Sequence, residues 1–170
     1  MNRIAVLEIF DDEIDFVTYY TIRLIENDVK AELSETEKFY ETYDNEDHPN
    51  FSEFDIIARV IDAMGYSENG AEAHFFRFED AAGALPPGKK ATERLLETKI
   101  ATDSQLRLYT IRLRNEVVVL LNGAVKTEIE ALNCPNVRVH FKFAQAIAKA
   151  IDELIFDKSI VIEGKKIINN

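Results

Sequence analysis

The clearest hydrophobic pattern in the chain lies between residues 106 and 127, which read LRLYTIRLRNEVVVLLNGAVKT. Arginines interrupt the apolar residues of the first part, and a continuous aliphatic run follows at 117–121. The pattern predicts two antiparallel strands, the second of them covered on both faces in the middle of a sheet. Arg114 and Asn115 are expected to form the turn, because asparagine tolerates the positive φ of two-residue hairpin turns. Gly123 indicates a bulge or the end of the second strand.

The first 70 residues are expected to be mainly helical. Residues 13–25 place apolar side chains at a spacing closer to a helix than to a strand, while 4–10 fit a short strand or the start of a helix. The segment 65–71, GYSENGA, interrupts the pattern and is the best candidate for a domain boundary. The sequence therefore predicts an N-terminal region over 1–70 and a second region over 71–170.

Two further helices in the first region have recognisable starting signals. Ser34 and Glu37 form a capping box, which opens a charged helix through about Tyr43. Ser52 is expected to cap the next helix, whose apolar side chains lie along one side as far as Met64.

The second region mixes strands and helices. Residues 73–79 are expected to form a strand, 92–99 a helix, and 159–168 a terminal strand or small hairpin. The segment 137–143, VRVHFKF, alternates like a strand, but its continuation FAQAIAKAIDELI has helical spacing. One long helix that begins near Pro135 is favoured, because proline suits the first helical position. These elements predict a small α+β protein, either in two regions or as one compact domain.

Charge is distributed unevenly along the chain, whose net charge is -11. Residues 1–75 contain 5 Lys/Arg and 19 Asp/Glu, a net charge of -14, whereas residues 76–170 contain 15 Lys/Arg and 12 Asp/Glu, a net charge of +3. The acidic part repels nucleic acid at long range, and the mildly basic part can hold phosphate locally. The alternative is that the acidic part is simply a solvated helical surface.

Several classes of protein are excluded by composition. Cys134 is the only cysteine, so the chain has neither an internal disulfide nor a thiolate zinc cluster, and it fits a reducing cytoplasm. The run at 117–121 is far shorter than the ~20 apolar residues that span a bilayer, so no membrane association is expected. The N-terminus turns acidic where a signal peptide would need small residues, which argues against secretion.

Two segments resemble ligand loops but lack the required chemistry. The segment 83–90, GALPPGKK, approaches a phosphate-binding loop, yet Pro86 and Pro87 lack the backbone N–H groups that such a loop uses. The acidic loop 43–51 has no calcium-binding spacing. We therefore expect neither a cofactor nor a metal site.

The basic residues of the hairpin are the strongest candidates for function: Arg107, Arg112, Arg114 and Lys126. Lysine and arginine on an edge strand commonly prevent aggregation between sheets, which is the structural interpretation. The functional interpretation is a phosphate-binding face, since guanidinium groups bind phosphate oxygens in pairs and stabilise charge that develops at phosphorus.

At these residues the chain resembles the RelE/ParE superfamily of toxin proteins, and most of all its HigB-like branch. The similarity lies mainly in residues 105–127, where LRLYTIRL and VVVLLNGAVKT carry it, and it is weaker over 73–157, which include the alanine-rich FAQAIAKAID. Arg107 matches the strand arginine of that family, and Lys126 and Thr127 match the lysine and threonine after its glycine turn. Arg77 in FFRFED takes a position that is often basic. The chain departs from the family in being acidic overall.

The resemblance implies an α+β fold with a small twisted antiparallel sheet and helices packed on it. It also implies a toxin, neutralised by an antitoxin protein, that cleaves messenger RNA at the ribosome without a metal. Arg107 and Lys126 would stabilise the transition state, and His140 would act as general acid or base. Tyr109 is the weaker alternative because its ordinary pKa is about 10. Arg77, Arg112 and Arg114 would bind the substrate together with Tyr109.

Three functions follow as hypotheses. The first is a toxin-like ribonuclease. The second is a non-enzymatic interaction module whose acidic N-terminal region binds a basic protein. The third is another phosphodiesterase or nucleic-acid-binding activity on the same scaffold.

Overall fold

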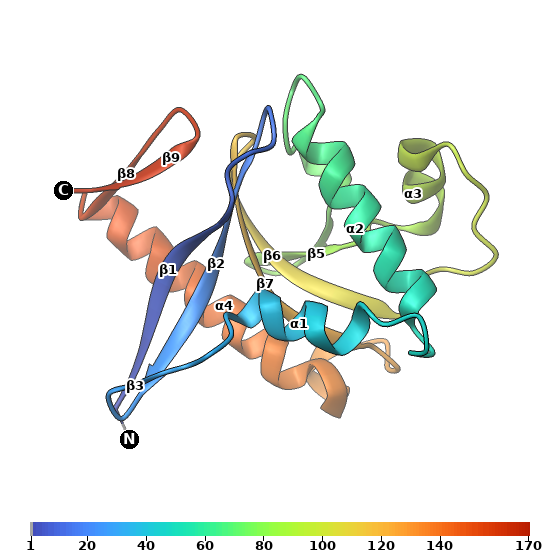
Figure 1. The fold of residues 1–170 in the computed structure, drawn as a ribbon, viewed down its shortest axis with the longest axis horizontal. Helices are drawn as coiled ribbons and strands as arrows, with labels where there is room; N and C mark the ends of the chain where they lie inside the picture. The colour runs from blue at the N-terminus through green and yellow to red at the C-terminus, as the bar shows by residue number, and fades with distance from the viewer. Residues whose placement is uncertain (1) are drawn as a thin grey trace.

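Strands from both regions of the chain form one seven-stranded sheet with helices on both faces (Figure 1). The computed structural model describes residues 2–170. The strands of this sheet are β1 (Arg3–Asp11), β2 (Thr18–Glu26), β3 (Val29–Lys30), β4 (Arg77–Glu79), β5 (Ala82–Leu85), β6 (Leu106–Arg114) and β7 (Val117–Val125). The helices are α1 (Glu35–Tyr43), α2 (Phe51–Gly65), α3 (Lys89–Leu96) and α4 (Pro135–Phe156), with short 3₁₀ turns at Ala73–Phe75 and Ala131–Asn133. A separate hairpin of β8 (Ile160–Glu163) and β9 (Lys166–Asn169) follows α4.

The α+β class is confirmed, but the sheet is mixed and not antiparallel throughout. Its order is β1-β2-β7-β6-β5-β4, with β3 paired to β2. β2 and β7 run parallel, whereas the other neighbouring pairs run antiparallel. A parallel pair needs a long crossover connection, and here the three helices α1, α2 and α3 and the four strands β3, β4, β5 and β6 separate β2 from β7 along the chain. The N-terminal region begins with two strands of the sheet, so the expectation of a mainly helical region is not confirmed.

The helix predicted over 13–25 is in fact largely β2. Residues 18–22 are all buried, because helices cover both faces of the sheet at this point. A strand buried on both faces loses the alternation of apolar and polar residues, so its sequence can resemble one side of a helix. The ambiguous segment 4–10 is the strand β1.

Each face of the sheet has its own hydrophobic core. On one face, α4 contributes Val137 and Phe141 to a core shared with β2, β6 and β7. On the other face, α1 contributes Phe39 and α2 contributes Met64 to a second core with the same central strands. Figure 1 shows α4 crossing behind the sheet while α1 and α2 lie in front of it, and α3 lies beside α2.

The predicted hairpin of β6 and β7 is confirmed, with its turn one residue further along the chain. Arg114 pairs with Val117, so the turn residues are Asn115 and Glu116, and neither has a positive φ. Gly123 lies next to a bulge in β7, as predicted. A Cβ atom at Gly123 would collide with the carbonyl oxygen of Arg107, which explains why glycine suits this position.

Most of the predicted helices are present, with shifts at their ends. The capping box of Ser34 and Glu37 is confirmed, and α4 begins at Pro135 as predicted. Ser52 does not cap α2, because the helix already begins at Phe51 and Asn50 holds the cap position. α3 begins three residues before the predicted start at Thr92.

The remaining predicted elements differ in extent. Of the strand predicted over 73–79, the final three residues form β4, and a 3₁₀ turn occupies the first three. The predicted terminal hairpin is confirmed as β8 and β9. Lys165 fastens this hairpin to the β1–β2 turn, since its Nζ donates to the carbonyl oxygens of Ile14 at 2.8 Å and Asp15 at 3.0 Å. The backbone N–H of Ile167 donates to the Tyr20 hydroxyl at 2.9 Å.

The first turn of α1 fills the space where β2 and β7 separate. These strands pair only over Thr18–Tyr20 and Val117–Val119, and the fully buried Thr36 lies between them where the pairing stops. The Thr36 hydroxyl donates to the Leu120 carbonyl oxygen at 2.8 Å and lies 2.7 Å from the Thr21 hydroxyl oxygen. One helix side chain thus supplies hydrogen bonds that a longer ladder would otherwise make.

Thr36→Val should destabilise the protein, because the side chain keeps its shape but Leu120 and Thr21 lose a buried hydrogen-bond partner. Unsatisfied buried polar groups cost about 1–3 kcal/mol, so we expect the free energy of unfolding in urea to fall by about 2 kcal/mol. Thr42→Val is the matched control, since Thr42 is exposed on the same helix and its hydroxyl bonds the Lys38 carbonyl. Equal losses in the two variants would contradict the role of Thr36.

Candidate functional site

The basic residues predicted from the hairpin do not share one surface. Arg107 and Lys126 lie where the paired part of β7 ends, whereas Arg112 and Arg114 lie beside the β6–β7 turn. Arg107 and Arg114 are separated by about 23 Å, given the usual rise per residue of a strand. The cations therefore form two groups at opposite ends of the hairpin.

Arg107 and Lys126 converge on the carboxylate of Glu79, at the end of β4. The Lys126 Nζ lies 3.2 Å from Glu79 Oε1, and the Arg107 Nε lies 3.9 Å from the same oxygen. Fully buried Tyr109 lies close by, since the Glu79 charge acts on its hydroxyl. We call Glu79, Arg107, Tyr109 and Lys126 the Glu79 cluster. Sequence reasoning missed its central carboxylate, because Glu79 lies in a strand of only three residues.

Burial governs the electrostatics of the Glu79 cluster. Burial lowers the pKa of Arg107, the Arg77 guanidinium lowers it further, and the Glu79 carboxylate opposes both effects. Burial and the charge of Glu79 raise the pKa of Tyr109, so this phenol stays protonated at neutral pH. Within residues 2–170, Glu79 Oε2, Arg107 Nε and the Tyr109 hydroxyl have no hydrogen-bond partner. The cluster thus holds charges and polar atoms in the interior of the protein.

Only part of the Glu79 cluster reaches the surface. Glu79 and Lys126 line a depression of about 200 Å³, together with Asp80, Glu130 and apolar residues. Arg107 is 7% exposed and does not line this depression. Because three carboxylates surround Lys126 here, the depression is an unfavourable place for a phosphate group.

Arg77 is held by Asp103 and by two backbone carbonyl groups. Its guanidinium pairs with Asp103 at 3.0 Å and donates to the carbonyl oxygens of Pro86 and Pro87, both at 3.2 Å. The segment 83–90, which resembles a phosphate loop in sequence, therefore serves to hold an arginine through its carbonyl groups. The charge of Arg77 lowers the pKa of Arg107, but Arg77 itself is already paired.

Arg112 and Arg114 belong to the turn end of the hairpin. The Arg112 Nε donates to the Ala71 carbonyl oxygen at 2.7 Å, and its Nη2 donates to the Asn115 side-chain oxygen. Arg112 thus joins β6 to the segment that follows α2. Arg114 is exposed.

His140 lies in α4 and faces the first turn of α1, so it does not join the Glu79 cluster. Desolvation lowers the pKa of His140, the Glu35 carboxylate opposes this shift, and the Lys38 ammonium adds to it. Glu35 and Lys38 themselves form an ion pair at 2.7 Å. Because 137–143 is helical, Arg138 and Lys142 diverge from His140, and the three do not form a basic patch.

The surface of α1, α2 and their connection carries carboxylates that sequence reasoning did not group into a site. Between residues 41 and 62, six carboxylates are exposed against one exposed cation, Arg59. These six are Glu41, Asp44, Glu46, Asp47, Asp55 and Asp62, which we call the acidic face.

Tyr40 lies half-buried beside the acidic face. Its ring centroid lies 5.6 Å from that of Phe10 and 5.1 Å from that of Phe54. Burial raises the pKa of Tyr40 to about 12, and the charges of Asp62 and Asp44 contribute to the rise. Asp44 follows α1 whereas Asp62 belongs to α2, so only the fold brings both carboxylates to one aromatic side chain. Carboxylates beside an aromatic ring are suited to an arginine or lysine side chain.

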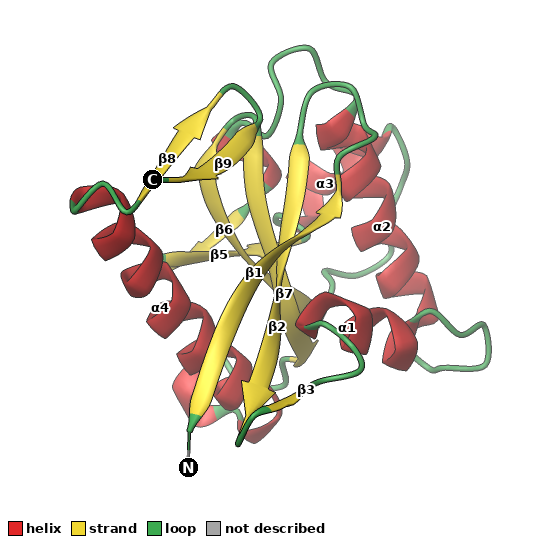
Figure 2. Cartoon of the chain, turned by 60° about the vertical axis from the view of Figure 1, so that its left-hand side comes forward, coloured by secondary structure: helices red, strands yellow, loops and turns green. Residues whose placement is uncertain are grey.

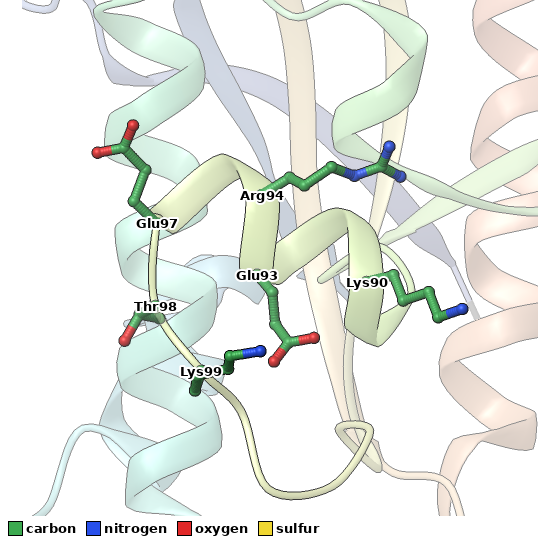
Figure 3. Close-up of a pocket in the computed structure, with 6 residues that line it drawn as sticks. All are labelled: Lys90, Glu93, Arg94, Glu97, Thr98 and Lys99. Carbon is green, nitrogen blue, oxygen red and sulfur yellow. The ribbon is translucent and has the colours of Figure 1, made fainter.

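The other open depressions mix both charges. One of about 580 Å³ beside α3 is lined by Lys90, Glu93, Arg94, Glu97, Thr98 and Lys99. Figure 3 shows Glu93 and Lys99 directed toward each other, while Lys90 and Arg94 extend away. Glu93 accepts a hydrogen bond from the Ile100 N–H at 3.0 Å, which lowers the pKa of Glu93. In the part of the chain from residue 2 onward, no three potential ligand side chains gather to hold a metal ion.

No protein-family model, curated protein or solved structure matches this chain. The relationship to RelE/ParE toxins therefore stays a prediction. Across residues 2–170, the helices are all too short or too polar to cross a membrane.

Glu79→Gln should destabilise the protein because it removes the charge that offsets Arg107 and Lys126. Breaking a buried ion pair by removing one partner costs about 3–5 kcal/mol, and we expect a loss near the lower end because Lys126 can turn toward solvent. Asp80→Asn is the matched control, since it removes the same charge from the exposed neighbouring residue. Urea denaturation measures both variants. A loss no greater for Glu79→Gln than for Asp80→Asn would show that the cluster does not stabilise the fold.

His140 should make the protein less stable as the pH falls. Its folded pKa lies below the ordinary value of about 6.5, so the unfolded state binds more protons and stability falls as the pH drops through that value. We expect the wild type to lose more unfolding free energy between about pH 7 and about pH 5 than His140→Gln does. His74→Gln replaces an exposed histidine and should keep the wild-type pH dependence. Identical profiles for wild type and His140→Gln would remove this assignment.

Proposed function

We propose that the protein is a non-enzymatic interaction module whose acidic face binds a basic protein surface. The observation that carries this proposal is that basic side chains make contacts within the protein, whereas the carboxylates of the acidic face are exposed. Arg77, Arg107, Arg112 and Lys126 are engaged in contacts within the protein. The carboxylates of the acidic face project into solvent.

The acidic face has the chemistry that recognition of a basic partner requires. Carboxylates bind guanidinium groups in pairs, and Asp44 and Asp62 lie near the half-buried side chain of Tyr40. Excess negative charge also accelerates the encounter with a positively charged protein. Such a partner need not enter a deep pocket, which agrees with the open surface of α1 and α2.

The ribonuclease hypothesis has weaker support from the geometry. Arg107, Lys126 and Tyr109 do converge, as that hypothesis requires. Attack on RNA further requires cations that can touch a phosphate, whereas Arg107 is 7% exposed and Lys126 pairs with Glu79. His140, the expected acid or base, faces α1. The geometry therefore supports an interaction module better than RNA cleavage, which is the alternative function.

Replacement of acidic-face carboxylates should weaken the binding of a short oligoarginine peptide, used here as a probe of basic protein surfaces. The variant Asp44→Asn/Asp55→Asn/Asp62→Asn should bind roughly tenfold more weakly by isothermal titration calorimetry, since three exposed pairs contribute about 0.5 kcal/mol each. Added salt should weaken wild-type binding, because the contacts are exposed.

The matched control, Glu97→Gln/Glu116→Gln/Glu153→Gln, removes three exposed carboxylates elsewhere and should leave binding near that of the wild type. Equal weakening in both triple variants would reduce the effect to net charge and overturn the acidic face. Growth arrest on expression of the wild type, relieved by Lys126→Ala, would replace the proposal with RNA cleavage.

A further inference from the structure

β1 leaves one of its two edges open. This strand of nine residues stands at the end of the sheet and, as far as residues 2–170 are concerned, pairs only with β2. Figure 2 shows β1 running along the front of the molecule, with its outer side turned to the viewer. A long edge strand presents unpaired N–H and C=O groups, which makes it a template for another strand.

α4 carries a second apolar stripe besides the one that packs on the sheet. The stripe consists of Val139, Phe143, Ala146, Ala150 and Leu154, which fall within roughly 80° of one another around a helix. All but Phe143 are exposed, and Val139 is 70% exposed. The buried side of α4 lies about 120° away from this stripe, so packing on the sheet does not account for it.

Contacts on both flanks of α4 show that the stripe faces the open edge of β1. On one flank, Gln145 bonds the Glu79 carbonyl oxygen at 2.8 Å and the Ala81 N–H at 2.9 Å, which fixes that side toward β4 and β5. On the other flank, the Arg3 guanidinium of β1 lies 5.7 Å from the Phe143 ring centroid. The stripe and the edge of β1 are therefore neighbours.

β1 continues the apolar surface toward its open edge. Leu7 packs into the core beneath α4, so Ala5 and Ile9, two residues to either side, face the same way. Ala5 is exposed and Ile9 is 48% exposed. Glu8 faces the opposite side, where it pairs with Arg23 at 2.9 Å. The open edge is thus bordered by apolar side chains on the α4 side, and the Glu8 carboxylate on the opposite side is already paired.

We propose that this surface binds a second copy of the same chain, with the two β1 strands antiparallel about a two-fold axis at Leu7. In this register Ala5 faces Ile9 of the second copy, and apolar residues meet across the axis. Arg3, whose Nε lies 3.1 Å from Glu26 Oε1 within its own copy, comes beside Asp11 of the second copy, so the ends of the strand have complementary charges. A bulge at Phe10 leaves this pair adjacent and not directly opposed.

The same axis explains the stripe on α4. Joining the β1 edges makes one continuous sheet, and the two α4 helices then lie on the same face of that sheet, on either side of the axis. Ala146 and Ala150 have small side chains, which allow two helices to approach closely. The dimer is isologous, since each copy uses the same residues, and it closes because it leaves neither β1 edge open, with β4 of each copy at the outer ends of the joined sheet. It does not depend on the acidic face.

Light scattering after size-exclusion chromatography tests the dimer on the full chain. We expect a mass twice the monomer value of 19.4 kDa. Ala146→Lys and Ile9→Lys each place like charges across the axis and should raise the dissociation constant roughly tenfold or more. Ala101→Lys makes the same change at an exposed alanine outside the surface and should leave the dimer intact. A monomer at about 50 µM, or a dimer unaffected by both patch variants, would overturn the proposal.

A crosslink tests the register. In Ala5→Cys/Ile9→Cys the two new thiols should form disulfides between copies, giving a covalent dimer on a non-reducing gel. They cannot join within one strand, because four residues span about 13 Å. The wild type is the control, since Cys134 is fully buried. A dimer in solution without this crosslink would refute the proposed pairing of β1.

The acidic-face variants lie outside this surface, so failure of one proposal does not imply failure of the other.

Discussion

The fold depends on the junction between β2 and β7. Only three residue pairs join the N-terminal strands to the rest of the sheet at this place. Thr36 extends the junction by bonding to Thr21 on one side and to Leu120 on the other. The capping box that starts α1 places Thr36 there, so a local helix signal helps to hold a contact between distant parts of the chain. Both hydrophobic cores rely on this arrangement, because each includes residues of β2 and of β7.

Basic and acidic side chains are used differently in this structure. Three of the four hairpin cations, Arg107, Arg112 and Lys126, contact groups that the sequence does not place beside them, such as Glu79 and the Ala71 carbonyl, whereas Arg114 is exposed. Buried ion pairs contribute little net stability, but the loss of one partner is costly. The paired cations therefore constrain the fold, whereas the carboxylates of the acidic face remain available to a binding partner. An acidic protein in which Arg77, Arg107 and Arg112 contact other parts of the chain suits recognition of basic surfaces better than contact with phosphate.

Local signals in the sequence were sufficient for several elements. The apolar run of β7, the capping box at Ser34 and the proline at the start of α4 each depend on neighbouring residues, and each prediction is confirmed. β2 was missed because burial on both faces removes the alternation that identifies a strand. The parallel pairing and the Glu79 cluster were missed for another reason. Both arise from contacts between residues far apart in the chain, which hydrophobic periodicity does not report.

The parallel pair also bears on how the chain reaches its native state. Thr18 meets Val117 only after about a hundred intervening residues have been synthesised, and Lys165 secures the β1–β2 turn later still. During synthesis on the ribosome, the hairpin of β1 and β2 is complete before β7, the strand that pairs with β2, has been made. Contacts of such long range slow folding and leave apolar strands accessible meanwhile. The newly made chain therefore exposes apolar residues of β2 until β7 has been synthesised.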